Sequence, residues 1–228
     1  LSGVGLADTN KVRIIASSDS CGGGSVVGVT SITGLSGTTA VTTGGSSDVY
    51  AVASVAISTG VHGSGYTVCW GHNPSANAHY MFEVGTFTLN GPVAENFECP
   101  MTVACTIQLT GTDLANTNKV KVQASGTTCS TSAGTATGYT GMTLDKQVTN
   151  AAGFNVYALG TASAGTAVNN LVLCWAHNNN YVFQISNAFQ MHGPTVGNEQ
   201  CTLTETCSLQ LSGVGLADTN KVRIIASS

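Results

Sequence analysis

The chain has 228 residues, which suffices for one large β domain or for two domains of about 100 residues each. Hydrophobic residues make up 42% of it, enough for a packed core, but charged residues make up only 8%, against about 25% in an ordinary soluble domain. The net charge of −4 and the seven Lys and Arg residues argue against nucleic-acid binding, which needs a positive field to neutralise phosphates.

Short alternating segments separated by turn residues run along the whole chain and predict β-strands. Lys11–Ile14 and Lys119–Val122 alternate charged and apolar residues, so we expect their charges to face solvent and to discourage edge-to-edge aggregation. No capped segment of about 10 residues keeps a helical period. The other predicted strands, in chain order, are Val49–Ile57, Tyr66–Gly71, Tyr80–Val84 paired with Phe87–Leu89, Val103–Leu109, Phe154–Leu159, Leu171–Ala176, Tyr181–Ile185 paired with Phe189–Met191, and Leu203–Leu211.

Two nested repeats organise the sequence. Residues 1–18 recur letter for letter as residues 211–228, which gives a period of 210 residues. Inside this period a more divergent repeat divides the chain into residues 1–108 and 109–210. Repeats of this length are typical of linear arrays, in which each module contacts mainly its neighbours.

Particular motifs align the two halves of the period. Leu1–Ile14 returns as Leu109–Val122, and the Cys-Trp-x-His motif beginning at Cys69 returns at Cys174. A Gly-Pro pair closes each copy at Gly91-Pro92 and Gly193-Pro194, and such a pair is a natural junction because Pro does not continue a central strand. With these junctions we expect a β-sandwich module lacking its first strand (1–91), a complete β-sandwich module (92–193) and the start of the next module (194–228).

Two assemblies are compatible with these boundaries. The chain is either a stretch of a long periodic polypeptide or a subunit that receives a β-strand from its neighbour, as in donor-strand assemblies. The duplicated 18 residues favour the periodic polypeptide, because in a discrete subunit two identical strands would compete for one position. The full length of the array stays open.

The eight cysteines form a repeated, even set, which is typical of disulfides in an oxidising compartment. A competing interpretation is zinc binding at the Cys-x-x-His spacings that begin at Cys69 and Cys174. Trp70 and Trp175 follow these cysteines and are expected to pack in the core. The expected disulfides are Cys21–Cys69, Cys99–Cys105, Cys129–Cys174 and Cys201–Cys207.

Ser and Thr must cover much of the surface because charges are so few, and this predicts attached sugars that keep the protein hydrated. No N-x-S/T acceptor is present, so the predicted linkage is to hydroxyl groups. The alternative is that these residues form ordinary polar turns. The candidate O-glycosylation sites are Thr38, Thr39, Thr42, Thr43, Ser46, Ser47, Thr127 and Thr128.

The cysteine spacing also carries a family resemblance. The pattern Cys-x5-Cys-x-(Ile/Leu)-x-Leu-x-Gly, followed by Asn-Lys-Val, resembles the opening of IPT/TIG-type immunoglobulin-like modules. The later Cys-Trp and Gly-Pro motifs resemble repeats in very long surface proteins of algae and other protists. The resemblance implies tandem extracellular immunoglobulin-like sandwiches that form a glycosylated fibril. One departure is that the usual Tyr-x-Cys corner is missing, since Tyr66 stands three residues before Cys69.

No nucleophile elbow, zinc-protease motif, phosphate-binding loop or dinucleotide fingerprint is present. We therefore expect no enzyme and no cofactor, but a structural unit of an extracellular or cell-surface filament or stalk. Its expected partners are neighbouring modules or identical subunits joined head to tail, and covalent glycans, without nucleic acid or membrane insertion. The alternative is an adhesin or carbohydrate-binding stalk that uses Asn73, Asn77 and His79, or Asn178–Asn180 with Tyr181.

Overall fold

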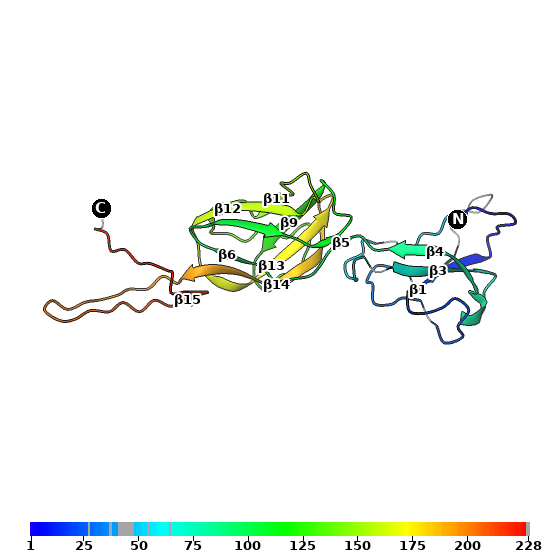
Figure 1. Cartoon of the computed structure of the whole chain (residues 1–228), viewed down its shortest axis with the longest axis horizontal. Helices are drawn as coiled ribbons and strands as arrows, with labels where there is room; N and C mark the ends of the chain where they lie inside the picture. The colour runs from blue at the N-terminus through cyan, green and yellow to red at the C-terminus, as the bar shows by residue number, and fades with distance from the viewer. Residues whose placement is uncertain (27, 37, 41–47, 54, 64, 227–228) are drawn as a thin grey trace. The chain divides into compact units, whose positions relative to one another are not determined.

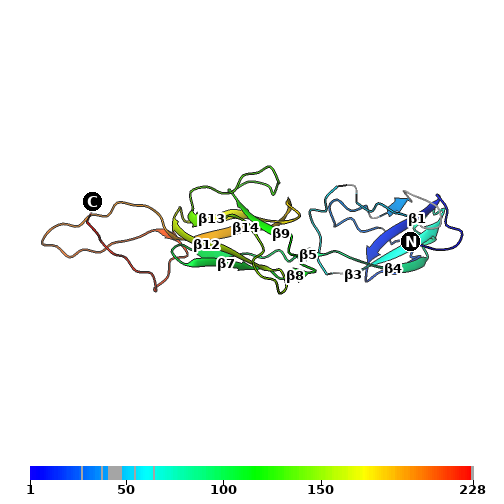
Figure 2. The ribbon, with the colours of Figure 1, turned by 90° about the horizontal axis from the view of Figure 1, so that it is seen from above.

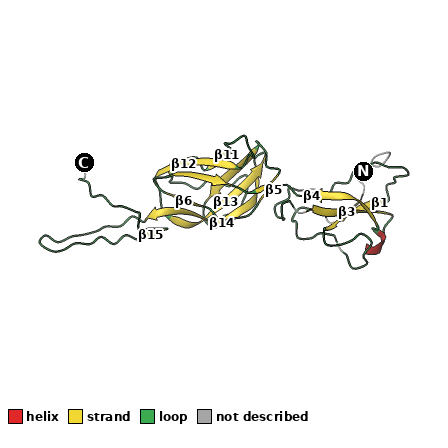
Figure 3. Cartoon of the chain, viewed as in Figure 1, coloured by secondary structure: helices red, strands yellow, loops and turns green. Residues whose placement is uncertain are grey.

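The computed structural model describes the chain except for residues 27, 37, 41–47, 54, 64 and 227–228. Among the described residues the structure is almost entirely strand and loop, with a single 3-10 turn at Asn77–His79 (Figure 3). The predicted all-β class is confirmed. Four of the predicted glycosylation sites lie outside the described residues: Thr42, Thr43, Ser46 and Ser47.

The chain forms two compact units, each made of two separate segments of the sequence. Unit 1 contains Leu1–Val93 and Leu109–Ala115, and unit 2 contains Ala94–Gln108 and Asn116–Ser228. The chain therefore passes from unit 1 into unit 2, returns for seven residues, and enters unit 2 again. Each unit is described separately below, with the strands labelled as in Figure 1.

Unit 1 contains a four-stranded antiparallel sheet in the order β2-β1-β3-β4. β1 pairs with β3 along its whole length, with Val12 opposite Trp70 and Ile14 opposite Val68. Ile14, Ile32 and Tyr66 are buried together under partly buried apolar neighbours, including Phe87. The strands are β1 (Asn10–Ala16), β2 (Thr38–Ala40), β3 (Gly65–His72) and β4 (Phe82–Thr88), with β5 (Gly91–Pro92) and β8 (Gly111–Thr112) as a separate short pair.

Unit 2 repeats this sheet and extends it. The order is β11-β9-β13-β14-β15, and β6 joins β14 in parallel (Figure 1). Val120 lies opposite Trp175 and Val122 opposite Leu173, which is the unit 1 register in the aligned residues. The strands are β6 (Glu98–Pro100), β9 (Asn118–Gln123), β11 (Asp145–Gln147), β13 (Val168–His177), β14 (Asn180–Pro194) and β15 (Gly213–Val214).

A second sheet covers one face of this large sheet in unit 2. It has the order β10-β12-β7, with β7 (Ala104–Gln108), β10 (Thr140–Met142) and β12 (Val156–Ala164). Figure 2 shows β7 and β12 as a layer beside β9, β13 and β14. The burial of β7 alternates, so that Cys105 and Ile107 are buried and their neighbours exposed. On β12, Tyr157 and Leu159 are fully buried, as expected for strands with one face on a core.

The burial of one basic residue in each charged strand contradicts the prediction made from the sequence. Arg13 and Lys121 were expected to face solvent, but they are only 9% and 7% exposed. A loop that begins at Cys21 or Cys129 folds over this face of the sheet, and its carbonyl groups take up the charges: Arg13 donates to Val26, and Lys121 donates to Thr131 and Ala133. Strand alternation identifies which residues share a face but not whether a loop covers that face.

Four strand predictions also need correction. Val49–Ile57 forms no continuous strand in its described part, only isolated bridges at Val49 and at Ala53, which pairs with Leu35. The two expected strand pairs near the end of each module are single strands, β4 and β14. Leu203–Leu211 contains no strand, and its residues are exposed.

Candidate functional site

Four disulfides join the eight cysteines as Cys21–Cys69, Cys99–Cys105, Cys129–Cys174 and Cys201–Cys207. These are the pairs that the repeat predicts. The bonds exclude the alternative zinc sites, because Cys69 and Cys174 have no thiolate to offer beside His72 and His177. Among the described residues, no group of three or more His, Cys, Asp or Glu side chains could hold a metal ion.

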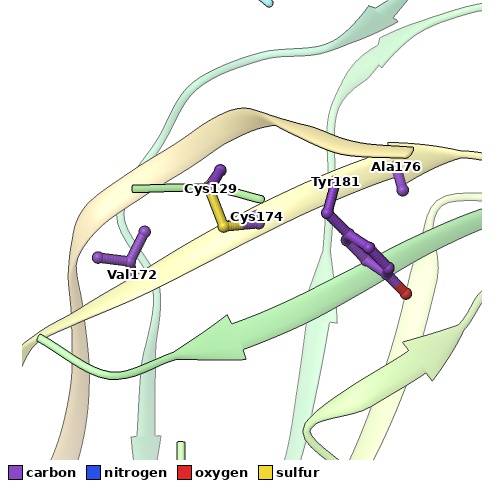
Figure 4. Packing of buried hydrophobic residues seen from close by; sticks show 5 residues of the cluster. All are labelled: Cys129, Val172, Cys174, Ala176 and Tyr181. Atoms are coloured by element: carbon purple, nitrogen blue, oxygen red, sulfur yellow. A yellow bond between two sulfur atoms is a disulfide. The ribbon is translucent and has the colours of Figure 1, made fainter. Parts of the chain in front are cut away.

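The long disulfide of each unit holds a loop over a basic residue and an aromatic ring. In unit 2, Cys129 and Cys174 pack with Val172, Ala176 and Tyr181 on one face of β13 (Figure 4). This face is opposite to the one that carries Leu173, so each module has apolar packing on both faces of its central strand. The staple therefore secures a second, smaller core outside the sheet.

A cation lies over the aromatic ring at the same place in both units. The Arg13 guanidinium is 4.0 Å from the centre of the Tyr80 ring, and the Lys121 ammonium is 4.2 Å from the centre of the Tyr181 ring. Both geometries permit a cation–π interaction. Burial, and then the hydrogen bond from its hydroxyl to Asp145, raises the pKa of Tyr181. This arrangement holds the loop against the sheet.

The two histidines that recur in the repeat make the same hydrogen bond. His72 Nδ1 lies 2.9 Å from Asn10 Oδ1, and His177 Nδ1 lies 3.0 Å from Asn118 Oδ1. Asn10 and Asn118 are fully buried at the first position of β1 and β9. Each histidine therefore fixes the start of one strand against the end of the strand paired with it, β1 with β3 and β9 with β13. This is a structural role.

The amide-rich stretches considered for sugar binding serve as turns. Asn178 and Asn179 have positive φ angles of 52° and 68° in the turn from β13 to β14, a conformation that Asn tolerates well. Asn77 Oδ1 accepts a hydrogen bond from Arg13, and the His79 ring accepts one from the Ser75 amide. Asn77 Oδ1 and the His79 ring are thus already engaged within the protein.

The described candidate glycosylation sites differ in accessibility. Thr127 and Thr128 are exposed, although the Thr127 hydroxyl donates to the carbonyl of Ala124. Thr38 is exposed on the edge strand β2, but its hydroxyl accepts a hydrogen bond from Arg13. The Thr39 hydroxyl is buried. Thr128 is therefore the described site whose geometry suits a glycan best.

A short joint recurs at the end of each module. Gly91 and Pro92 pair with Thr112 and Gly111, and in the same register Gly193 and Pro194 pair with Val214 and Gly213. A backbone hydrogen bond closes each joint, from Val93 to Thr110 at 2.8 Å and from Thr195 to Ser212 at 2.7 Å. Each Gly-Pro pair is thus bound by the Gly-x pair that lies 20 residues further on.

Glycine is required on the second strand of this joint. A Cβ atom added at Gly111 would lie 2.5 Å from the Gly91 carbonyl oxygen and 2.8 Å from the Pro92 Cα. Gly213 approaches Gly193 and Pro194 equally closely. Gly3, which has the same sequence neighbours as Gly213, has only Leu6 nearby, at 3.6 Å. Sequence reasoning identified Gly-Pro as a junction but missed this partner, although the glycine is common to all three copies.

Unit 1 also has an apolar groove of about 300 Å³. Val52, Val68 and Phe87 line it, together with Tyr50 and Leu1. Burial, and then the neighbouring Asp48 carboxylate, raises the pKa of Tyr50 to about 12. The lining is mostly aliphatic and aromatic, so the groove suits apolar side chains better than a polar substrate.

Comparison with known protein families, curated proteins and solved structures gave no significant match. In the described part of the chain, no helix is long and apolar enough to cross a membrane. The site is therefore defined by its own geometry: the repeated joint, the disulfide-held loops and the open groove of unit 1.

Proposed function

We propose that the chain is a structural repeat unit of an extracellular or cell-surface filament or stalk and does not act as a catalyst. The observation that carries the proposal is the repeated joint, which has the same register and the same closing hydrogen bond at the end of both modules. Because the joint recurs at the end of both modules, further repeats would extend the array with the same contact. In such arrays each module interacts mainly with its sequence neighbours.

Each module is proposed to be an immunoglobulin-like β-sandwich of the IPT/TIG type. Two features of unit 2 support this: the β10-β12-β7 sheet covers one face of the larger sheet, and the buried residues of β7 and β12 alternate along each strand. Two-sheet packing of alternating strands is the architecture of such sandwiches. The Cys99–Cys105 pair at the start of the module is the feature that most resembles these repeats.

The mechanism is mechanical and protective. Two disulfides tie a loop to a strand and two close short turns, and cross-links of this kind stabilise a fold chiefly by restricting its unfolded chain. Disulfides persist in oxidising surroundings, which supports an extracellular location. With 8% charged residues, the surface is proposed to carry O-linked sugars at Thr127 or Thr128 for hydration.

Electron microscopy of native material, combined with a denaturing and reducing gel, tests the proposal. We expect linear assemblies whose axial repeat corresponds to the two modules of one 210-residue period. On the reducing gel, a very large species is expected if the repeats are covalently linked, and a band near 23 kDa if subunits polymerise. Isolated compact particles at every protein concentration would contradict the proposal.

A further inference from the structure

We propose that the open groove of unit 1 binds residues 195–210 of a second copy of this repeat, which supply the counterparts of β6 and β7 of unit 2. We call this segment the donor hairpin. The inference rests on the proposed filament function and deepens it, because it names the contact that links one repeat to the next. Unit 2, where the corresponding residues are in place, provides the comparison that supports it.

In unit 2 the aligned segment, residues 93–108, contributes β6 and β7. β6 pairs in parallel with the end of β14, with Met191 opposite Cys99. β7 pairs with β12, with Val156 opposite Gln108 and Tyr157 opposite Ile107. Ile107 is 1% exposed. These two strands therefore complete both sheets of unit 2.

The residues that line the groove in unit 1 match fully buried residues in unit 2. Tyr50, Val52 and Val68 are partly exposed, whereas the aligned Tyr157, Leu159 and Leu173 are each 0% exposed. The same contrast holds for Phe87 and the aligned Phe189. Neighbouring apolar residues of unit 1 are more exposed still, with Val49 at 54% and Val55 at 65%. Unit 1 thus has the apolar surface of a complete module, and no strand among its described residues covers that surface as β7 does in unit 2.

The backbone of Leu1 marks where the donor hairpin ends. The Asp48 amide donates to the Leu1 carbonyl at 2.8 Å, and the Leu1 amino group donates to the Asp48 carbonyl at 2.8 Å. In unit 2, the residue after the one aligned with Asp48 pairs with Gln108. The same register places Gln210 opposite Val49. Gln210 then directly precedes Leu1 in space, as it precedes the identical Leu211 in the sequence.

The donor hairpin forms no strand in this structure. All of its residues are exposed, including Leu203 at 90% and Leu209 at 37%, and Figure 1 draws it as a long loop without strands. The Cys201–Cys207 disulfide closes its turn, as Cys99–Cys105 does between β6 and β7. The Thr195 to Ser212 hydrogen bond holds its base. Leu209 aligns with Ile107 and is the side chain expected to enter the groove.

The register of unit 2 predicts the contacts of the bound hairpin. Leu209 lies opposite Tyr50, the counterpart of Tyr157, while Cys201 lies opposite Leu89, the counterpart of Met191. Ser208 aligns with Thr106, which is exposed on β7, so its side chain faces solvent. Adjacent residues of one strand point to opposite faces, and this provides a matched pair of substitutions.

A disulfide-closed peptide of residues 195–210, added to the full chain, tests the inference. We expect it to bind and to slow amide hydrogen exchange at Val49–Val52, detected by mass spectrometry or NMR. A Leu209→Asp peptide should bind at least about 100-fold more weakly, because it places a charge in an apolar groove. A Ser208→Asp peptide, with the same charge one residue away, should bind like the parent peptide. Absence of protection, or equal effects of the two substitutions, would overturn the inference.

A fusion protein provides a second test that does not depend on the affinity of the added peptide. Joining residues 195–210 to the amino group of Leu1 should raise the unfolding midpoint of unit 1 and block the added peptide, whereas the same fusion with Leu209→Asp should do neither. Equal midpoints for the two fusions would also overturn the inference. If native material forms filaments but the peptide does not bind, the hairpin contact is refuted and the filament is not. If the peptide binds but native material contains only compact particles, the filament is refuted and the hairpin contact is not.

Discussion

The Arg13 guanidinium lies 4.0 Å from the centre of the Tyr80 ring and also donates to the side chain of Asn77 and the carbonyl of Val26. One buried cation therefore connects strand β1, the disulfide-held loop and the 3-10 turn. Lys121 takes the equivalent position in unit 2, beside Tyr181. Because the arrangement recurs in both units, this basic residue anchors the loop and is not part of the solvated face.

Replacing Arg13 should therefore destabilise unit 1. In Arg13→Ala, partly buried acceptors lose their donor and the ring of Tyr80 loses its cation, and we expect the free energy of unfolding to fall by about 1–3 kcal/mol. Arg13→Lys keeps the cation over Tyr80, as Lys121 does over Tyr181, and should cost less. Urea unfolding of the two variants measures the difference. An Arg13→Ala chain as stable as the parent would show that the cation contributes nothing to the anchorage.

Removing a long disulfide and removing a short one should change the stability of unit 2 by different amounts. Removing Cys129 and Cys174 together as alanines opens a separation of 45 residues, and the chain-entropy model predicts a loss of about 3–4 kcal/mol. Replacing Cys201 and Cys207, which lie in an exposed segment 6 residues apart, should leave the stability of unit 2 nearly unchanged. Thermal unfolding of both double variants checks this. Equal losses would contradict the assignment of the long disulfide to the core.

The joint offers a comparison between identical sequence contexts. Gly213→Ala should disrupt the pairing with Gly193 and Pro194, because the added Cβ has no room. Gly3→Ala, within the same surrounding residues, meets only Leu6 at 3.6 Å and should have little effect on the isolated chain. Hydrogen exchange at the Thr195 amide, which bonds to Ser212, is the readout. Unchanged protection in Gly213→Ala would show that the joint does not depend on close approach.

Buried tyrosines should make the protein sensitive to alkali. Burial raises the pKa of Tyr157 to about 12, although the Trp175 indole partly opposes this shift. A free tyrosine has a pKa of about 10, so the folded state favours the neutral phenol. The resulting stability is fully present below pH 10 and is lost as the pH rises towards 12. Urea unfolding at pH 8 and pH 11 should show this loss, and Tyr157→Phe should reduce it. An identical loss in Tyr157→Phe would assign the titration to other groups.

Local pattern was sufficient to predict much of the fold. Alternation in Lys119–Val122 predicted β9, and the repeat matched Cys129 with Cys21 and Cys174 with Cys69, the partners found in the structure. Each of these predictions depends on residues within one strand or on one pair of aligned positions. Such features are encoded by the local sequence and recur at aligned positions in both halves of the chain.

Other features depend on what lies on top of a strand, which no local pattern contains. The burial of Lys121 follows from the loop that covers β9. Val49–Ile57 has the same alternation as β12, yet its described part forms isolated bridges and not a continuous strand, because alternation alone does not determine how far the pairing of a strand extends. The second strand of each joint was missed because Gly111 is recognisable only by its close approach to Gly91.

Small-angle X-ray scattering of chains containing one, two and three copies of the 210-residue period tests the filament account most directly. A linear array predicts a constant cross-sectional radius and a maximum dimension that grows by the same increment with each added copy. A radius of gyration that grows only as for a compact globule, with a widening cross-section, would contradict it.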